Sequence, residues 1–243
     1  MEPANAYPKT YKLLDRVFIV EKDKYIKREL TEDEYFRRPN GQVIHPYWVR
    51  ERIQNEADAI TFIRANTDIP VPKCRLYRQG GLLHLETTRI PGIMLDDVAQ
   101  DKKPTAIDAV TEQINGNILP QLRRLHRRTI GFLDCALPVI PPPRIYRRDR
   151  RSWERVIAPE TRPFVFCHND LNNRNILVDP TTFRITGIID WEFAGYFPSE
   201  WELALWPLDW EGGRLLNEQV ERRDLALFGL EPEDLRDCLE ERP

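Results

Sequence analysis

The chain has 243 residues and a formal net charge of −3, with 41% hydrophobic and 31% charged residues. This length can bury a substantial core in one domain or in two small lobes. The slight negative charge gives no general attraction to nucleic acid, and no apolar run approaches the ~20 residues that span a bilayer, so we expect neither nucleic acid nor a membrane as a partner.

The N-terminal segment and the cysteines indicate the compartment. Residues 1–16 lack the apolar stretch of a secretory signal. The cysteines show no metal-ligand spacing and no disulfide framework; they are Cys74, Cys135, Cys167 and Cys238. The four histidines are isolated from one another and form no structural zinc pattern. We therefore expect a reducing, cytoplasmic environment.

The first predicted elements are two strands, at 17–20 and 25–27, around a charged turn at 21–24. A helix is predicted over 47–66, because apolar residues recur there at helical spacing. Glu56 falls near the middle of this apolar stripe. A buried carboxylate is costly unless a cation pairs with it, and a lysine on the neighbouring strand is the obvious partner. The alternative is a carboxylate at the rim of the stripe that reaches solvent.

The middle of the chain is predicted to pass from strands into a helical region. Two prolines make residues 69–72 extended. Strands are expected at 75–79 and 82–85, around a pair of glycines. Apolar residues at helical spacing between 107 and 125 indicate another helix. Pro120 and a preceding glycine interrupt it, so we expect a kinked or two-piece helix.

Residues 138–155 contain three consecutive prolines, which cannot continue a helix, and a loop is therefore predicted. The arginines of this segment are Arg144, Arg147, Arg148, Arg150, Arg151 and Arg155. They could attract an anionic substrate. A solvated basic loop is the simpler interpretation and the one that we favour.

The most informative stretch runs from 164 to 195. Apolar residues at 164–167 and 176–178 predict two short strands around a polar loop. A third strand, at 183–189, follows a turn that contains a proline. This strand delivers Asp190 at its end.

Such a hairpin can bring Asp170, Asn175 and Asp190 together, although they lie far apart in the sequence. Two carboxylates and an amide oxygen at strand ends suit Mg²⁺, which prefers hard oxygen ligands and keeps several waters. The alternative is a polar hairpin with a capped turn. Asp-x-x-x-x-Asn followed by a strand-end Asp is also the arrangement of kinases, in which the first Asp takes the proton of the acceptor hydroxyl.

The segments HNDLNNRN, at 168–175, and IIDWEFAG, at 188–195, resemble the aminoglycoside phosphotransferase and choline kinase-like family, particularly its small fungal members. Two further segments are similar to parts of the same family. They are NTDIPVP, at 66–72, and a Pro-x-x-Trp-Glu pattern at 198–202.

The resemblance implies an α+β fold, bilobal and protein-kinase-like. Its N-lobe, a small antiparallel sheet, would comprise residues 1–88, and its mainly helical C-lobe would comprise residues 89–243. ATP would lie between the lobes. The hinge backbone at Thr88 and Ile90 would bind the edge of the adenine ring.

The resemblance also assigns roles around the phosphates. Lys27 would hold the phosphates of ATP, and Glu56 would orient that lysine. Asn175 and Asp190 would bind Mg²⁺. Asp170 would align and deprotonate the hydroxyl of the acceptor.

His168 is counted with the catalytic residues, because it lies in the same loop, where it would brace the loop by hydrogen bonds rather than transfer protons. The chain departs from the family pattern at two points nearby. The turn at 21–24, which the resemblance places over the nucleotide, has no glycine for close approach to a phosphate. Thr88 stands where members usually carry an acidic residue.

The C-terminal region is short, because only about fifty residues follow Asp190. Antibiotic-modifying relatives usually have a longer helical substrate region, so the acceptor pocket should be reduced or built differently. We expect Trp201 and Trp206 to anchor the core here. The charged tail from Glu218 is predicted to form a surface helix.

The leading hypothesis is an ATP- and Mg²⁺-dependent phosphotransferase that acts on the hydroxyl of a small molecule. The alternative is a catalytically inactive or repurposed kinase fold that binds a ligand or partner. A protein kinase fits less well, because Asn172 occupies the place of the catalytic-loop lysine and Asp-Trp-Glu replaces Asp-Phe-Gly. Dispersed histidines argue against a metal hydrolase. The acceptor and the oligomeric state do not follow from the sequence.

Overall fold

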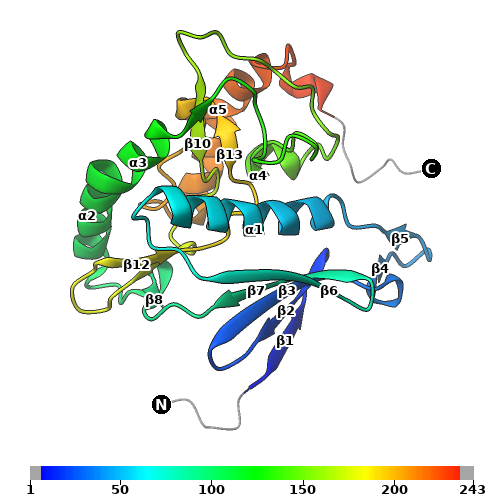
Figure 1. Ribbon diagram of the computed structural model, residues 1–243, viewed down its shortest axis with the longest axis horizontal. Coiled ribbons are helices and arrows are strands. Elements are labelled where there is room, and N and C mark those ends of the chain that lie inside the picture. Colours follow the sequence, from blue (N-terminus) through cyan, green and yellow to red (C-terminus); the bar gives the residue numbers. More distant parts are fainter. Residues whose placement is uncertain (1–6, 236–243) are drawn as a thin grey trace.

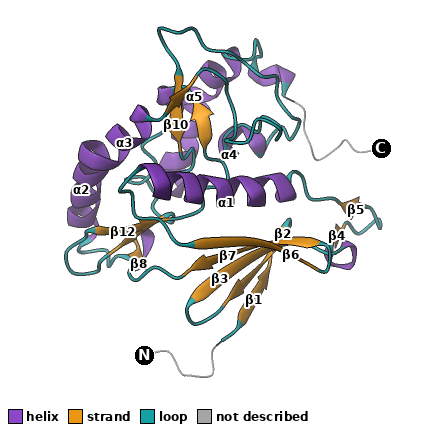
Figure 2. Cartoon of the chain, viewed as in Figure 1, coloured by secondary structure: helices purple, strands orange, loops and turns teal. Residues whose placement is uncertain are grey.

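The computed structural model describes residues 7–235, which form an antiparallel sheet, a central helix and a larger, mainly helical part (Figures 1 and 2). The sheet has the strand order β1-β2-β3-β7-β6, and every neighbouring pair is antiparallel. Its strands are β1 (Lys9–Lys12), β2 (Arg16–Val20), β3 (Lys24–Glu29), β6 (Cys74–Gln79) and β7 (Leu82–Thr88).

Helix α1 (Val49–Asn66) crosses between the sheet and the larger part of the molecule (Figure 1). Val49, Ile53 and Ala57 pack with residues of β7, whereas Ile60 and Ile63 belong to the main core. Because the apolar residues of α1 face both layers, the helix fixes the position of the sheet relative to the helical part.

The larger part contains two small antiparallel sheets, with the strand orders β12-β11-β8 and β13-β10-β9. The separate hairpin β4-β5 lies near the N-terminal end of α1 (Figure 1). The strands are β4 (Phe36–Arg37), β5 (Val43–Ile44), β8 (Ile93–Met94), β9 (His126–Arg127), β10 (Phe164–Cys167), β11 (Ile176–Val178), β12 (Ile185–Ile188) and β13 (Gly195–Phe197). The helices are α2 (Lys103–Gln113), α3 (Leu119–Arg124), α4 (Pro143–Tyr146) and α5 (Trp210–Ala226). Short 3-10 turns are η1 (Glu32–Glu34), η2 (Leu95–Asp97), η4 (Ser199–Trp201) and η5 (Pro232–Asp234).

The predicted two-piece helix is confirmed. A π-helical turn, η3 (Ile114–Ile118), joins α2 to α3. Pro120 has no N–H to donate to the preceding turn, and its ring crowds that turn, so the chain widens before α3 begins.

The predicted core anchors are also confirmed, because Trp201 and Trp206 are buried in the main core, as is Cys167. Trp210, by contrast, is 73% exposed. The third strand of the hairpin is shorter than predicted and begins at Ile185, because Phe183 adopts a left-handed backbone (φ 57°) in the preceding turn. No helix within residues 7–235 is both long and apolar enough to cross a membrane.

The interpretation of 138–155 as a solvated basic loop is wrong in part: Arg147, Arg148 and Arg155 are exposed, but the segment contains a helical turn and Arg144 is withdrawn from solvent. Proline favours the first turn of a helix, and Pro143 begins the single turn of α4. The side chain of Arg144 is 3% exposed and forms an ion pair of 2.7 Å with the buried Asp224 of α5. Arg148 reaches Glu221 of the same helix at 2.5 Å. Arg144 and Arg148 therefore fasten this segment to α5.

The predicted C-terminal surface helix exists but lies earlier than expected. Helix α5 begins at Trp210, after the cap residue Asp209, whose side chain accepts a hydrogen bond from Gly212 N at 2.8 Å. It ends at Ala226, and the end of the predicted tail, 236–243, lies outside the described residues. Three cysteines within 7–235 are free thiols, and Cys238 also lies outside that part of the chain.

Candidate active site

The loop between β10 and β11, residues 168–175, is the candidate catalytic loop and carries the first group of predicted site residues. Some of its hydrogen bonds lie within the loop: Asn172 N donates to Asp170 O at 2.9 Å, and Asn175 Nδ2 donates to the same oxygen at 2.8 Å. Asn172 Nδ2 also donates to Asp170 Oδ1 at 3.0 Å. The loop therefore holds the carboxylate of Asp170 in a fixed orientation beside the side chain of Asn175.

Asp190 reaches the same place from β12. Ile189 N donates to Asn175 O at 3.0 Å, which aligns the end of this strand with the catalytic loop. Asp190 itself has a left-handed backbone with φ 66°, an uncommon conformation for a residue other than glycine. This turn redirects the chain at the carboxylate, and such local strain is frequent at functional sites.

Lys27 connects the sheet, α1 and the hairpin. Its Nζ lies 2.7 Å from both carboxylate oxygens of Glu56 and 2.6 Å from Asp190 Oδ1. The side chain of Glu56 is only 3% exposed, so the alternative of a carboxylate reaching solvent is wrong. Burial opposes a charge on Lys27, but Asp190 and Glu56 raise the pKa of Lys27 above its usual range. The lysine therefore carries a positive charge between two carboxylates.

Asp170 differs from Asp190 in its protonation. Burial, followed by the nearby charge of Asp190, raises the pKa of Asp170 to about 7. For Asp190, burial is outweighed by Lys27, which lowers the pKa of that carboxyl. A carboxyl that titrates near neutral pH is suited to accept a proton, whereas one that stays ionised is suited to hold a cation.

His168 lies beneath the loop and is fully buried. Its Nε2 contacts Ile189 O at 3.0 Å, and its Nδ1 lies 3.3 Å from Asp170 N. Burial lowers the pKa of His168 to about 4, so the ring is neutral at pH 7. With Nε2 donating and Nδ1 accepting, this side chain ties the catalytic loop to the end of the third hairpin strand.

The two hinge residues lie apart from this group. Thr88 ends β7, and its N–H donates to Lys73 O at 2.9 Å, so that donor is already used. The side chain of Ile90 lies over β12, where a Cβ on Gly187 would come within 2.4 Å of it. Neither residue lines the cavity that contains Asp170 and Asp190; both line a separate hollow of about 430 Å³ beside the end of α1.

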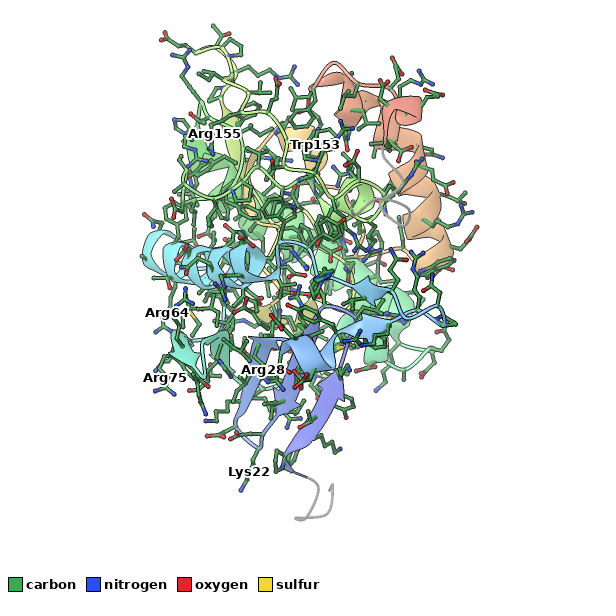
Figure 3. All side chains as sticks on the ribbon, turned by 90° about the vertical axis from the view of Figure 1, so that its right-hand side faces the viewer. Lys22, Arg28, Arg64, Arg75, Trp153 and Arg155 are labelled. Atoms are coloured by element: carbon green, nitrogen blue, oxygen red, sulfur yellow. The ribbon has the colours of Figure 1, made fainter. Side chains whose placement is uncertain are left out.

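The turn at 21–24 does not lie over the site, which corrects the expectation that it covers the nucleotide. Asp23 O accepts a hydrogen bond from Arg89 N at 2.8 Å, which places this turn at the hinge. Lys22 lies at the lower edge of the sheet in Figure 3, away from the helical part. The turn between β1 and β2, at 13–15, is the one that approaches Asp170 and Asp190. It also contains no glycine.

Two cavities meet at the catalytic loop. The interlobe cavity, of about 630 Å³, lies between the β1–β2 turn, residues 42–47, α4, Asp170 and Asp190. The α5 cavity, of about 580 Å³, lies between the catalytic loop, residues 144–148 and α5. Both volumes are in the range of small-ligand sites. Among the lining residues, Asp170 and Arg147 are shared by the two cavities.

Several residues around the site were missed by sequence reasoning. Glu202 is one: its carboxylate accepts hydrogen bonds from the backbone N–H groups of His168 and, at 3.2 Å, of Asn169. The Trp-Glu pair at 201–202 was the available signal, but only its tryptophan was interpreted. Glu202 therefore supports the catalytic loop from below.

A buried ionic network lies on the other side of Asp190. Glu192 Oε2 lies 2.6 Å from Arg16 of β2 and 3.0 Å from Arg52 of α1. Arg52 also pairs with Asp15 of the β1–β2 turn. No periodic pattern marks these arginines, since each lies on a separate element. The network connects the β1–β2 turn to α1 and to the segment after Asp190.

Comparison with known proteins gives a consistent result. The sequence model described as "Phosphotransferase enzyme family" matches residues 15–236. An aminoglycoside 3'-phosphotransferase from Streptomyces ribosidificus is 28% identical over 172 residues, which is 63% of this chain and 61% of that protein. A second one, from Streptomyces fradiae, is 26% identical over 179 residues, which is 63% of each chain. The matched part is thus less than two thirds of these relatives' lengths.

Among solved structures, an aminoglycoside phosphotransferase from Streptomyces rimosus superposes with a TM-score of 0.52 at 18% identity. The superposition covers 93% of this chain and 87% of that one. Similarity at this level of identity shows the fold. The expected α+β, kinase-like fold is therefore confirmed.

Proposed function

The chain belongs to the phosphotransferase enzyme family, and from this premise we propose that it transfers the γ-phosphoryl group of ATP to a hydroxyl of a small molecule with the help of Mg²⁺. The observation that carries the proposal is the convergence of Lys27, Asp170, Asn175 and Asp190 from three separate segments. The alternative of a polar hairpin with a capped turn does not explain why a lysine of the sheet lies against Asp190.

The residues present fit a magnesium ion. Asn175 uses its amide nitrogen to hold Asp170 O, and no residue within 7–235 donates a hydrogen bond to its Oδ1. The carboxylate of Asp190 stays ionised, because Lys27 outweighs burial and lowers its pKa, and an ionised carboxylate is a ligand that Mg²⁺ prefers. Asn175 and Asp190 would hold Mg²⁺, which supplies charge neutralisation on the triphosphate.

The protein groups divide the remaining work. Lys27 would turn from Asp190 to the phosphates while Glu56 keeps its side chain in place. Asp170 would orient the acceptor hydroxyl and take its proton, and its pKa of about 7 suits that role. His168 and Glu202 would hold the catalytic loop in position.

The nucleotide would enter between the sheet and the helical part. We propose that the adenine edge meets the hinge at Thr88 and Ile90, as the family resemblance implies. Because the N–H of Thr88 is bonded to Lys73, the N–H of Ile90, which has no hydrogen-bond acceptor among residues 7–235, is the better donor. We propose that the hinge separates an N-lobe of residues 1–88 from a C-lobe of residues 89–243. We also propose that the protein acts in the cytoplasm.

A second candidate is a kinase fold that binds a ligand without catalysis. The turn at 13–15 favours it, because it carries two exposed leucines and no glycine for close contact with phosphates. The intact group of Asp170, Asn175 and Asp190 opposes it.

Thermal unfolding with ATP, with and without Mg²⁺, tests the proposal. We expect ATP to raise the melting temperature with Mg²⁺ and to have little effect with EDTA, because ligand binding to the folded state stabilises it. AMP with Mg²⁺ is the matched control, since it lacks the β- and γ-phosphates of ATP. An equal shift by ATP with and without the metal would contradict the proposal.

A further inference from the structure

The α5 cavity lies on the side of Asp170 where an acceptor would bind. It is lined by Asp170, Asn172 and Asn173 but not by Lys27 or Asp190, which lie on the side proposed for the phosphates. In phosphoryl transfer the attacking and leaving oxygens lie roughly in line on opposite sides of the phosphorus. An acceptor in the α5 cavity would therefore approach Asp170 from the side opposite to ADP.

The charges of this cavity balance each other. Its five carboxylates are Asp96, Asp170, Asp209, Glu218 and Glu221, and its five guanidiniums are Arg144, Arg147, Arg148, Arg174 and Arg214. A polycationic acceptor, such as an aminoglycoside, needs carboxylates in excess of the cations around them. The α5 cavity offers no such excess.

The pairing of these groups is more informative than their number. Glu221 pairs with Arg148 at 2.5 Å, Asp96 pairs with Arg174 at 3.2 Å, and Glu218 pairs with Arg214. Asp209 caps α5. Every carboxylate of the cavity except Asp170 therefore forms an ion pair or caps a helix, whereas Asp170 accepts a hydrogen bond from the amide of Asn172.

Arg147 is the exception among the cations. Arg144 is bonded to Asp224, and three other arginines have the partners given above, but the exposed guanidinium of Arg147 forms no ion pair or hydrogen bond within residues 7–235. It lies at the junction of the two cavities, next to the catalytic carboxyl, because Asp170 is the other residue that lines both. Burial raises the pKa of Asp170 and the charge of Arg147 opposes this rise, but no hydrogen bond or ion pair within residues 7–235 occupies the guanidinium, which is therefore available to a ligand.

We infer that the acceptor is a hydroxylated small molecule with a carboxylate or phosphate close to the reacting hydroxyl, and that Arg147 pairs with this anion. The inference rests on the proposed function. In the reaction, the acceptor oxygen forms a bond to the γ-phosphorus while the bond from that phosphorus to the β–γ bridging oxygen breaks. The hydroxyl proton passes to Asp170, and ADP leaves. Arg147 takes no part in these bond changes and determines which acceptor is held.

The test uses acceptors that share a carbon skeleton and differ in charge. Two suitable sets are glycerate, glycerol and 3-amino-1,2-propanediol, and gluconate, glucose and glucosamine. ADP release by the full chain with Mg-ATP gives kcat/KM for each. We expect the carboxylate member to exceed the neutral and amine members by about tenfold or more, the size of one charge-assisted contact.

Variants of Arg147 separate recognition from catalysis. Arg147→Gln should raise KM for the carboxylate acceptor by about tenfold, leave its kcat nearly unchanged and leave the neutral acceptor unaffected, and Arg147→Lys should restore part of the loss. Arg162→Gln is the matched control, because Arg162 is exposed and pairs with Glu200 outside both cavities. The control should behave as the parent protein does.

Three outcomes would overturn the inference. The first is a neutral or amine acceptor that is used best. The second is an equal loss for all acceptors in Arg147→Gln, which would assign Arg147 to the transferred phosphoryl group. The third is no transfer to any anionic acceptor although Mg-ATP stabilises the protein. Failure of Mg-ATP to stabilise it would instead remove the proposed function.

Discussion

The two sides of Asp170 are built in different ways. On the side proposed for the nucleotide, called the nucleotide side, Lys27 joins Glu56 and Asp190 across β3, α1 and the hairpin within 2.7 Å. On the acceptor side, arginines of the segment around α4 are paired with carboxylates of α5, and Arg147 is left over. The nucleotide side is thus a compact cluster of groups that can exchange partners with a ligand. The acceptor side is mostly a set of structural ion pairs.

The difference shows how the two sides can diversify. Phosphoryl transfer of this kind needs a lysine, a metal and a base in a fixed geometry, so few residues on the nucleotide side can be replaced. The acceptor side needs only a cavity that opens onto the base, and any set of side chains can line it. On the inference made above, acceptor choice on that side would follow from the charges left unpaired, such as that of Arg147.

The largest expected effect would come from the residue at the boundary of the two sides. Asp170→Asn should lower kcat by about 10²- to 10⁴-fold, because the base is lost while the shape of the side chain is kept. ADP release in the presence of the best acceptor measures this. Stabilisation by Mg-ATP should remain as in the parent protein, since Asp170 is not placed on the metal. Transfer at the parental rate would show that Asp170 is not the base.

The structural nature of the acceptor side can be tested with the buried pair Arg144–Asp224. Arg144→Met should lower the free energy of unfolding by about 1.5–3 kcal/mol, because the buried carboxylate of Asp224 loses a charge-assisted hydrogen bond and keeps only Arg223 as an ionic partner within residues 7–235. Urea denaturation followed by tryptophan fluorescence measures the change. Arg162→Gln, at an exposed pair, should change it by less than about 1 kcal/mol. Equal effects of the two variants would contradict the distinction drawn here.

Because His168 is held neutral, we expect the free energy of unfolding to depend on pH. Burial lowers the pKa of His168 to about 4 from 6.5, so the unfolded chain binds a proton at higher pH than the folded one. The stability that depends on this residue is therefore present above pH 6.5 and is lost as the pH falls toward 4. Between pH 7 and pH 5 the contribution of His168 to the free energy of unfolding should fall by about 2 kcal/mol.

The control for this loss is His168→Gln, which has no titrating group at the position. Its free energy of unfolding, measured by urea denaturation at both pH values, should fall by about 2 kcal/mol less than that of the parent protein over the same interval. A parallel fall in both proteins would mean that His168 is not held neutral by burial.

The catalytic hairpin could be predicted from sequence because it is local. Apolar residues at 164–167 and 176–178 gave strand boundaries that agree with β10 and β11 to the residue. Glu56 was recognised because a single carboxylate on an apolar helical stripe needs a partner. By contrast, β1 has the sequence KTYK with mostly exposed residues, so no alternation marks it, and its absence moved the expected nucleotide turn to the wrong place.

The acceptor side could not be predicted, because its geometry depends on contacts between distant segments. Arg144 and Asp224 are eighty positions apart, and nothing in either local pattern indicates the other. Arg147 became distinctive only once the partners of its neighbours were known. Glu202 likewise acquired a role from the backbone of a loop more than thirty residues earlier.

Calorimetric titration with ATP, with and without Mg²⁺, in the parent protein and in Asp190→Ala tests the central claim most directly. That claim is that Asp190 and Asn175 hold Mg²⁺ on the triphosphate. We expect Mg²⁺ to strengthen ATP binding to the parent protein by about tenfold or more, and to have no such effect on Asp190→Ala. If Mg²⁺ strengthened ATP binding equally in both proteins, Asp190 would not be a metal ligand and the claim would be wrong.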